Sequence, residues 1–220
     1  MRVEPIDVAG DPPVRGVLHP GRVPAADGLV LTHGAGGNRD APLLVAVAEA
    51  FAVRGVTVLR CDLPYRQTRP RGAPSPAGAA RDREGLRASL TVLRTRVTGR
   101  LFLGGHSYGG RQASMLLAAE PTLASGLLLQ SYPLHPPGRP ADLRTAHLPQ
   151  LRVPALFVHG VTDVFAAPAE LESARALIPG PTRILSINGG HDLGWGKKRS
   201  GHSLPATIAD TFLDLMRTSG

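Results

Sequence analysis

Cysteine and long hydrophobic runs are nearly absent from this sequence. Cys61 is the single cysteine among 220 residues, which excludes an internal disulfide. The longest apolar stretch, Leu43 to Val53, contains Glu49 and is shorter than the roughly 20 apolar residues of a membrane-spanning helix. The sequence therefore predicts no such helix. The beginning, MRVEPIDVAG, has an early acid and a proline but no apolar run, unlike a secretory signal. We therefore expect a cytoplasmic protein with no membrane partner.

Lysine is also scarce. Lys197 and Lys198 are the only two among 25 basic residues, which leaves 23 arginines and a net charge of +8. The arginines are scattered, with small clusters at 66–71 and 197–199, whereas a nucleic-acid-binding protein gathers its basic residues on one face. We interpret the arginine excess as a bias of composition and expect no nucleic-acid partner.

Short apolar runs alternate with helix-like segments along the chain. The runs predict strands at 28–32, 56–60, 101–104, 126–130, 155–159 and 183–187, and helices are expected at 42–53, 79–96, 108–119, 168–177 and 204–217. Nearly unbroken apolar strands indicate a parallel sheet covered on both faces. Residues 3–8 and 14–18 are expected to be edge strands, for which an antiparallel arrangement is one option. We expect one domain over 1–220 and irregular loops at 64–76 and 133–140.

The segment GGHSYGG, residues 104–110, contains the pattern G-x-S-x-G around Ser107. This pattern is typical of a sharp strand-to-helix turn that exposes a nucleophilic serine above a parallel sheet. By itself it is a weak signal, because glycine-rich loops with serine are common turns. Here an apolar strand precedes the serine and a helix-like segment follows it, as the turn requires.

A serine hydroxyl needs a base within hydrogen-bonding reach. Only His191 and His202 follow both the serine and a plausible acid in the chain. His191 comes four residues after the predicted strand 183–187, in NGGH, whereas His202 lies farther out in a basic loop. Since side chains that follow parallel strands meet at one edge of the sheet, we predict His191 as the base.

The base needs an acid that orients it, and Asp163 follows the predicted strand 155–159 directly. Four other acidic residues are alternatives for this role. Asp142 lies in a proline-rich loop, Glu170 and Glu172 belong to a helix start, and Asp192 adjoins the histidine itself. We predict a triad of Ser107, Asp163 and His191, although Asp163 also fits an ordinary turn aspartate.

Two backbone amides are expected to stabilise the oxyanion that forms when the serine attacks a carbonyl. One belongs to Tyr108, which follows the serine at a helix N-terminus. The other is expected in the glycine-rich HGAGGN segment after strand 28–32, at Ala35, with Gly34 as the alternative. Backbone donors need no side chain, in agreement with the small residues of this loop.

Three further residues, Arg66, Arg111 and Tyr132, are candidates for contacting substrate. Arg111 lies in the first turn of a helix, where positive charge is unfavourable. We therefore hypothesise an ion pair between Asp62 and Arg111, and an anion-binding role for Arg66 or Arg111. Tyr65, Tyr132 and Trp195 follow strand ends and are expected to pack as loop residues or to line the mouth of the site. Cys61 is expected to be a buried residue at a strand end.

The segments LTHGAGGNRDAP, LRCDLPYRQTRP, SYPLHPPGRP and HGVTD, together with residues 104–121, resemble the α/β-hydrolase superfamily, close to its dienelactone-hydrolase-like branch. Within it they resemble a group of small lidless hydrolases that includes testis-expressed protein 30 and the hydrolase-like region of a chromatin acetyltransferase complex subunit. The resemblance covers about residues 14–217. It implies a mostly parallel sheet flanked by helices on both faces, without a lid domain. Dienelactone hydrolases use a cysteine nucleophile where this chain has Ser107, and similar hydrolases often have proline where it has Val164.

The sequence thus predicts a serine hydrolase that cleaves a carboxylic ester or thioester of a small substrate through an acyl-enzyme. Amide hydrolysis and acyl transfer would use the same residues. The chemistry calls for no metal or organic cofactor. The rival hypothesis is a binding or scaffold module that keeps the hydrolase fold without catalysis, because fold does not dictate function.

Overall fold

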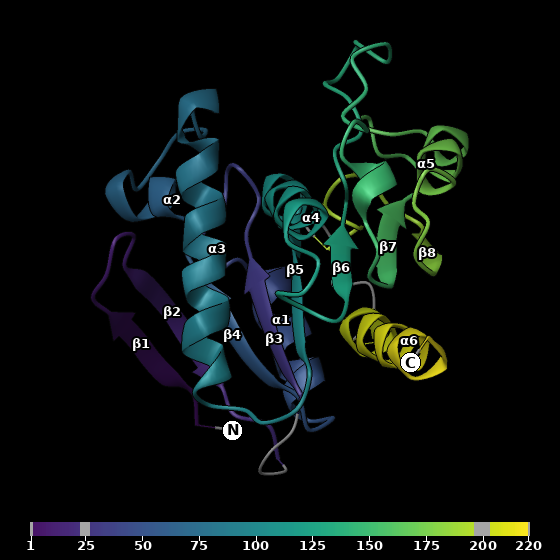
Figure 1. Cartoon of the computed structure of the whole chain (residues 1–220). Coiled ribbons are helices and arrows are strands. Elements are labelled where there is room, and N and C mark those ends of the chain that lie inside the picture. Colours follow the sequence, from purple (N-terminus) through teal and green to yellow (C-terminus); the bar gives the residue numbers. More distant parts are fainter. Residues whose placement is uncertain (1, 23–26, 196–202, 220) are drawn as a thin grey trace.

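The computed structural model describes residues 2–22, 27–195 and 203–219, and Figure 1 shows their arrangement. Its centre is an eight-stranded sheet in the order β1-β2-β4-β3-β5-β6-β7-β8. The β1–β2 and β2–β4 pairs are antiparallel and all other pairs are parallel. The strands are β1 (Glu4–Val8), β2 (Val14–His19), β3 (Gly28–Thr32), β4 (Thr57–Cys61), β5 (Leu101–His106), β6 (Leu127–Gln130), β7 (Ala155–Gly160) and β8 (Thr182–Ile187).

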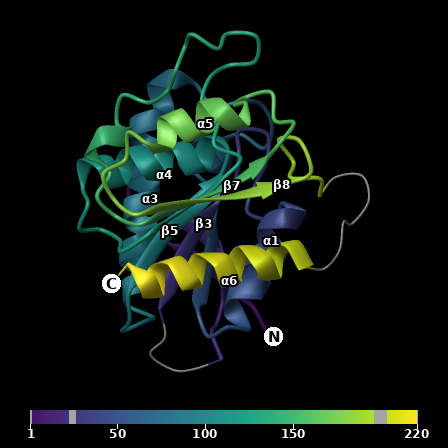
Figure 2. The same ribbon diagram turned by 90° about the vertical axis from the view of Figure 1, so that its right-hand side faces the viewer.

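Helices cover both faces of the sheet (Figure 2). Helices α1 and α6 pack against each other on one face, and α3, α4 and α5 lie on the opposite face. The helices are α1 (Pro42–Ala52), α2 (Pro64–Thr68), α3 (Ala79–Arg94), α4 (Tyr108–Ala119), α5 (Pro168–Arg175) and α6 (Ser203–Thr218). Within the described ranges, no helix combines the length and the apolar character that crossing a bilayer requires.

The central strands are almost wholly apolar because both of their faces are covered. Every residue of β3, β4, β6 and β7 is buried. Successive side chains of a strand point into two different cores on the two faces of the sheet. Leu127 and Leu129 of β6 pack towards α3 and α4, whereas Leu128 packs towards α1 and α6. The same alternation determines on which face of the sheet a polar residue at a strand end lies.

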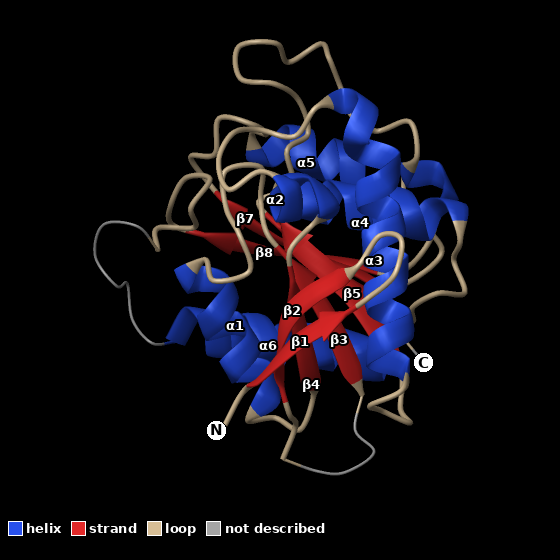
Figure 3. Ribbon diagram, turned by 90° about the vertical axis from the view of Figure 1, so that its left-hand side faces the viewer, coloured by secondary structure: helices blue, strands red, loops and turns tan. Residues whose placement is uncertain are grey.

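The predicted elements agree with the structure within two residues at each end, and the two N-terminal strands form an antiparallel pair at one edge (Figure 3). One element was missed. The segment 64–68, expected to be irregular, forms the short helix α2. After β6, the described chain contains only the three-residue 3₁₀ turn Leu148–Gln150 before β7, so the predicted absence of a lid domain is confirmed.

The carboxyl ends of the parallel strands lie along one edge of the sheet. β3 ends at Thr32, β5 at His106, β7 at Gly160 and β8 at Ile187. The loops that leave these four strands carry the residues that the sequence singled out for chemistry.

Candidate active site

Ser107 occupies a strained turn between β5 and α4. Its φ is 49° and its ψ is −116°, outside the regions that non-glycine residues favour. The glycines of the pattern are required by space: a Cβ at Gly105 would lie 2.8 Å from the Gly110 amide nitrogen, and one at Gly109 would lie 2.6 Å from Cγ2 of Thr32. The Ser107 amide donates to the Gln130 carbonyl over 2.8 Å, which ties the turn to β6.

Ser107, His191 and Asp163 are joined by hydrogen bonds although they come from three separate loops. Nε2 of His191 lies 2.8 Å from Oγ of Ser107, and Nδ1 of His191 lies 2.8 Å from Oδ2 of Asp163. The Asp163 side chain is fully buried, whereas the His191 side chain is 26% exposed. The structure therefore brings together the three side chains that the sequence singled out, in the order acid, imidazole and hydroxyl.

The Asp163 carboxylate is held ionised by its partners. Burial acts to raise its pKa, but hydrogen bonds from His191 and from the Phe165 amide, 2.9 Å from Oδ1, outweigh burial and leave the pKa below its ordinary value. A carboxylate on Nδ1 fixes the imidazole tautomer in which Nε2 is free to accept a proton.

The loop that carries His191 is anchored by His106, the variable residue of the serine motif. Nε2 of His106 lies 2.9 Å from the His191 carbonyl oxygen and donates to it. Burial of His106 lowers the pKa of its imidazole, so the ring is neutral near pH 7. Gly160 lets the same loop approach β7, because a Cβ there would lie 2.5 Å from the Gly189 carbonyl oxygen.

Three carbonyl groups of the loop after β3, those of Gly34, Ala35 and Gly37, accept hydrogen bonds from side chains of α2 and from His33. Arg66 donates through Nε to Gly37 and through Nη2 to Ala35, each over 2.8 Å. The Tyr65 hydroxyl donates to the carbonyls of Gly34 and Ala35, over 3.2 and 2.9 Å. His33 Nδ1 donates to the Gly34 carbonyl over 2.8 Å, while its Nε2 accepts from the Leu63 amide.

The backbone amides of this loop differ in their hydrogen bonding, since the Gly37 amide donates to the Gly34 carbonyl over 3.0 Å. In the described part of the chain, no residue accepts a hydrogen bond from the amide of Ala35 or of Tyr108. Both residues adjoin Ser107: Gly34 and Ala35 line the same cavity as the serine, and Tyr108 begins α4. These two amides therefore stay candidates for the donors that a site of developing negative charge requires.

Asp82 of α3 is a buried acid that sequence reasoning missed. Its Oδ1 accepts from the Tyr65 amide over 3.1 Å and its Oδ2 accepts from the Tyr108 hydroxyl over 2.7 Å. Burial raises the pKa of Asp82, against the effect of these two donors. Asp82 therefore connects the start of α2 with the residue after the nucleophile. An acid in a helix pattern gives no signal of this role in the sequence.

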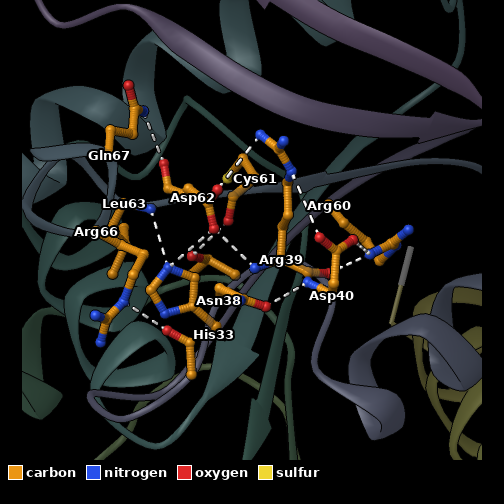
Figure 4. A network of polar contacts seen from close by, with 12 residues as sticks. His33, Asn38, Arg39, Asp40, Arg60, Cys61, Asp62, Leu63, Arg66 and Gln67 are labelled. Atoms are coloured by element: carbon orange, nitrogen blue, oxygen red, sulfur yellow. Dashed lines mark hydrogen bonds and ion pairs between the residues drawn. The ribbon is translucent and has the colours of Figure 1, made fainter. Parts of the chain in front are cut away.

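A second polar network holds the far end of the same loop against β4 (Figure 4). Oδ1 of Asp62 accepts from the Arg39 amide over 2.7 Å, and Oδ2 pairs with the Arg39 guanidinium at 3.3 Å. The hypothesised pair of Asp62 with Arg111 is therefore wrong. The arginine that pairs with Asp62 comes from the loop after β3, whereas Arg111 lies in the first turn of α4.

The three residues considered for substrate contact do not line the cavity beside Ser107. Arg66 is buried and uses its guanidinium on backbone carbonyls, including those of Arg69 and Gly72. Tyr132 is 1% exposed and donates to the Arg144 carbonyl over 2.8 Å. Arg111 is half-buried, and its Nε has no partner among the described residues. These placements correct the substrate-contact hypothesis: Arg66 and Tyr132 bind the protein's own backbone, and Arg111 lies away from the cavity.

The sequence also singled out other residues at or after strand ends, and the structure describes all of them except His202. Cys61 is buried at the end of β4, as predicted, and burial raises its pKa to about 11. Trp195 lines the cavity, whereas Tyr65 binds the loop carbonyls. His202, the alternative base, lies outside the described residues. In the three described ranges, no cluster of three or more His, Cys, Asp or Glu side chains is arranged to hold a metal ion.

The cavity itself has a volume of about 890 Å³, within the range of about 300–1,000 Å³ that small-molecule sites occupy. Its floor contains Ser107, His106, His191 and Gln130. The side-chain amide of Gln130 has no hydrogen-bond partner among the described residues. The remaining lining residues are His33, Gly34, Ala35, Gly36, Gly37, Ala41, Pro42, Leu43, Leu44, Phe165, Asp192 and Trp195.

The buried neutral histidine His19 predicts how the stability of the fold depends on pH. His19 accepts from Arg60 Nε over 2.8 Å, and burial together with the Arg60 charge lowers its pKa to about 4. Between pH 6.5 and 4 the unfolded chain binds a proton that the folded chain does not, so stability falls as the pH falls. We expect a His19→Gln variant, which keeps an acceptor for Arg60, to remove on the order of 1 kcal/mol per pH unit from this slope. Urea unfolding of both proteins at pH 7, 6 and 5 measures it, and parallel slopes would contradict the assignment.

The fold and the serine turn define a class of protein: a mostly parallel α/β sheet with a strained serine after its fifth strand. A family model described as an alpha/beta hydrolase domain matches residues 25–218, so the chain belongs to the alpha/beta hydrolase family. The predicted α/β-hydrolase fold class is confirmed by this match and by solved structures.

Three solved structures illustrate the likeness. The dienelactone hydrolase of Anabaena variabilis has a TM-score of 0.74 and 19% identity, over 99% of this chain and 98% of that one. Est1E from Butyrivibrio proteoclasticus has a TM-score of 0.75 and 14% identity, over 97% of this chain and 99% of that one, and has also been solved with ferulic acid bound. TT1662 from Thermus thermophilus has a TM-score of 0.72 and 23% identity, over 98% of both chains. At these identities the likeness extends to the fold.

Proposed function

We propose that this protein is a serine hydrolase that cleaves a carboxylic ester or thioester of a small substrate. The observation that carries the proposal is the pair of 2.8 Å hydrogen bonds that join Asp163, His191 and Ser107, with the serine in a strained turn that lines a cavity. A serine hydroxyl within reach of an oriented neutral imidazole is the arrangement that activates the oxygen for attack on a carbonyl.

In the proposed reaction, Oγ of Ser107 attacks the carbonyl carbon while Nε2 of His191 takes the hydroxyl proton. The carbonyl oxygen becomes an oxyanion that the amides of Ala35 and Tyr108 stabilise. When the tetrahedral intermediate collapses, His191 passes its proton to the departing alcohol or thiol, which leaves an acyl-Ser107 ester. A water molecule then repeats the sequence, with His191 as base, and releases the acid. Asp163 keeps the imidazole oriented and stabilises its charged form.

The size of the cavity and the relatives support a small-molecule substrate. The cavity of about 890 Å³ accommodates a ligand of small-molecule size. Est1E, which shares the fold, binds ferulic acid, a small carboxylic acid. The narrower likeness to testis-expressed protein 30 and to the chromatin-complex subunit stays a prediction from the sequence segments, as do the cytoplasmic location and the single domain over 1–220.

A fluorophosphonate probe tests the proposal, because it reacts covalently with serine only where an activated hydroxyl is present. We expect the wild-type protein to be labelled and Ser107→Ala to lose labelling completely. Ser131 provides a control, since it is another serine with a positive φ, 50°, directly after a strand, and its side chain is buried. Ser131→Ala should keep the label. An unlabelled wild-type protein would favour the non-catalytic binding module instead.

A further inference from the structure

The cavity beside Ser107 has two apolar walls. The first is made by the beginning of α1, where Ala41, Pro42, Leu43 and Leu44 face the site. Most apolar residues of α1 pack into the core, and Leu44 is itself 2% exposed. Leu43 is next to that buried stripe and is only partly covered, so part of its side chain is available to a ligand.

The second wall is aromatic. The Phe165 ring lies 4.3 Å from the His191 ring, centroid to centroid, at an angle of 37°. Trp195 follows a turn in which Leu193 and Gly194 both have positive φ, 55° and 71°, and its amide donates to the Asp192 carbonyl. Phe165 and Trp195 are each partly buried, so they present ring surface on the His191 side of the cavity.

The charge of the described lining is one-sided. It contains no arginine or lysine, in a chain with 25 of them, and its acid is Asp192, whose side chain is exposed. Among the described residues, Arg39 of the loop after β3 and Arg66 of α2 are engaged elsewhere, because Arg39 pairs with Asp62 and Arg66 binds backbone carbonyls. A carboxylate on a substrate would therefore lose water of hydration among apolar walls, with no described cation to compensate and with Asp192 repelling it.

We propose that the site selects uncharged esters that carry an apolar group next to the reacting carbonyl, and that it disfavours substrates with a carboxylate on that group. The apolar group lies between the start of α1 and the rings of Phe165 and Trp195, while the carbonyl oxygen faces the Ala35 and Tyr108 amides. This inference rests on the proposed ester hydrolysis and adds to it the chemical class of the substrate.

A pair of esters with acyl chains of equal carbon number tests the selectivity. p-Nitrophenyl hexanoate is neutral, and the mono-p-nitrophenyl ester of adipic acid ends in a carboxylate. We expect kcat/KM to favour the neutral ester by about tenfold or more, since a buried uncompensated charge is costly. Equal values, or a preference for the adipate ester, would overturn the proposal.

Two variants locate the cause within the cavity. Asp192→Asn should raise the ratio of kcat/KM for the adipate ester to that for the hexanoate ester by roughly threefold, because it removes a partly screened repulsion of the carboxylate. Leu43→Ser should raise KM for the hexanoate ester, by about fivefold, with kcat nearly constant. Leu177→Ser, at an exposed leucine outside the cavity, is the matched control and should change neither constant. If Leu43→Ser behaves like this control, the α1 wall does not bind substrate.

The fluorophosphonate label separates this inference from the proposed function. Loss of both labelling and hydrolysis would overturn the hydrolase assignment and the substrate class with it. A protein that is labelled at Ser107 but hydrolyses neither ester, or hydrolyses both equally, would keep an activated serine and overturn the substrate class alone.

Discussion

An Asp163→Asn variant is expected to reduce kcat for ester hydrolysis by about 10⁴-fold near pH 7, as in triads where the acid is replaced by its amide. The local hydrogen bonds explain why the amide is not a substitute. Oδ1 of Asp163 accepts from the Phe165 amide, so an asparagine would keep its carbonyl oxygen there and turn its NH₂ group towards Nδ1 of His191. That donor forces the imidazole proton onto Nε2, which then has no lone pair to accept the proton of Ser107.

Asp192→Asn is the control for this measurement, because Asp192 adjoins His191 in the chain but makes no contact with its imidazole in the described structure. Its kcat for a neutral ester should stay within a factor of about two. Thermal unfolding of both variants checks that the fold is kept. A value of kcat for Asp163→Asn within tenfold of the wild type would remove Asp163 from the mechanism and leave the serine with a different source of activation.

Arg66→Met is expected to lower kcat by about 10²-fold with little change in KM, the size of effect seen when an oxyanion donor is lost. Arg66 is a positioning residue in this view, since it touches no reacting atom. Its guanidinium binds four carbonyls, including those of Ala35 and Gly37, and is 5.0 Å from the centre of the Tyr65 ring. Without it the Ala35 amide is no longer fixed where the oxyanion forms.

The controls separate positioning from a general loss of folding. kcat is expressed per serine that reacts with the fluorophosphonate, so unfolded molecules do not count. Arg66→Lys should recover little, because an ammonium group is compact and does not span the carbonyls that the planar guanidinium joins. Added guanidinium at millimolar concentration should partly restore Arg66→Ala. Arg69→Met, at an exposed neighbour, should behave as wild type. An unchanged kcat per reactive serine in Arg66→Met would show that the loop after β3 keeps its conformation without the Arg66 guanidinium.

The fold was predictable from the sequence because its strands are buried on both faces and bounded by turn residues. β3 and β6 consist of nothing but apolar residues apart from one or two at their ends, and Pro42 and Pro168 mark helix starts that the structure confirms. The juxtaposition of Ser107, Asp163 and His191 follows from the same logic. Each comes just after its own parallel strand, and the carboxyl ends of those strands share one edge.

What the sequence did not predict depends on contacts between distant segments. Helix α2 has five residues and no apolar periodicity; Pro64 begins it and the distant Asp82 caps its Tyr65 amide. The partner of Asp62 was misassigned because the residue that binds it, Arg39, lies in the loop after β3 and not in α4. The apolar wall at Leu43 has no sequence signal either, since a leucine in an amphipathic helix is normally part of the core.

The outermost strand β1 also determines how the sheet ends. Its sequence is EPIDV, and Ile6 is its one buried residue, paired in register with Gly16 of β2. Pro5 has no N–H to offer a neighbouring chain, and Glu4 and Asp7 place carboxylates along the free edge. A strand from a second molecule would meet a missing donor and two charged side chains there, Asp7 paired with Arg15 and Glu4 paired with Arg96. The sheet therefore carries its own protection against edge-to-edge aggregation at β1, so a concentrated solution of this protein should not grow intermolecular β-structure from that side.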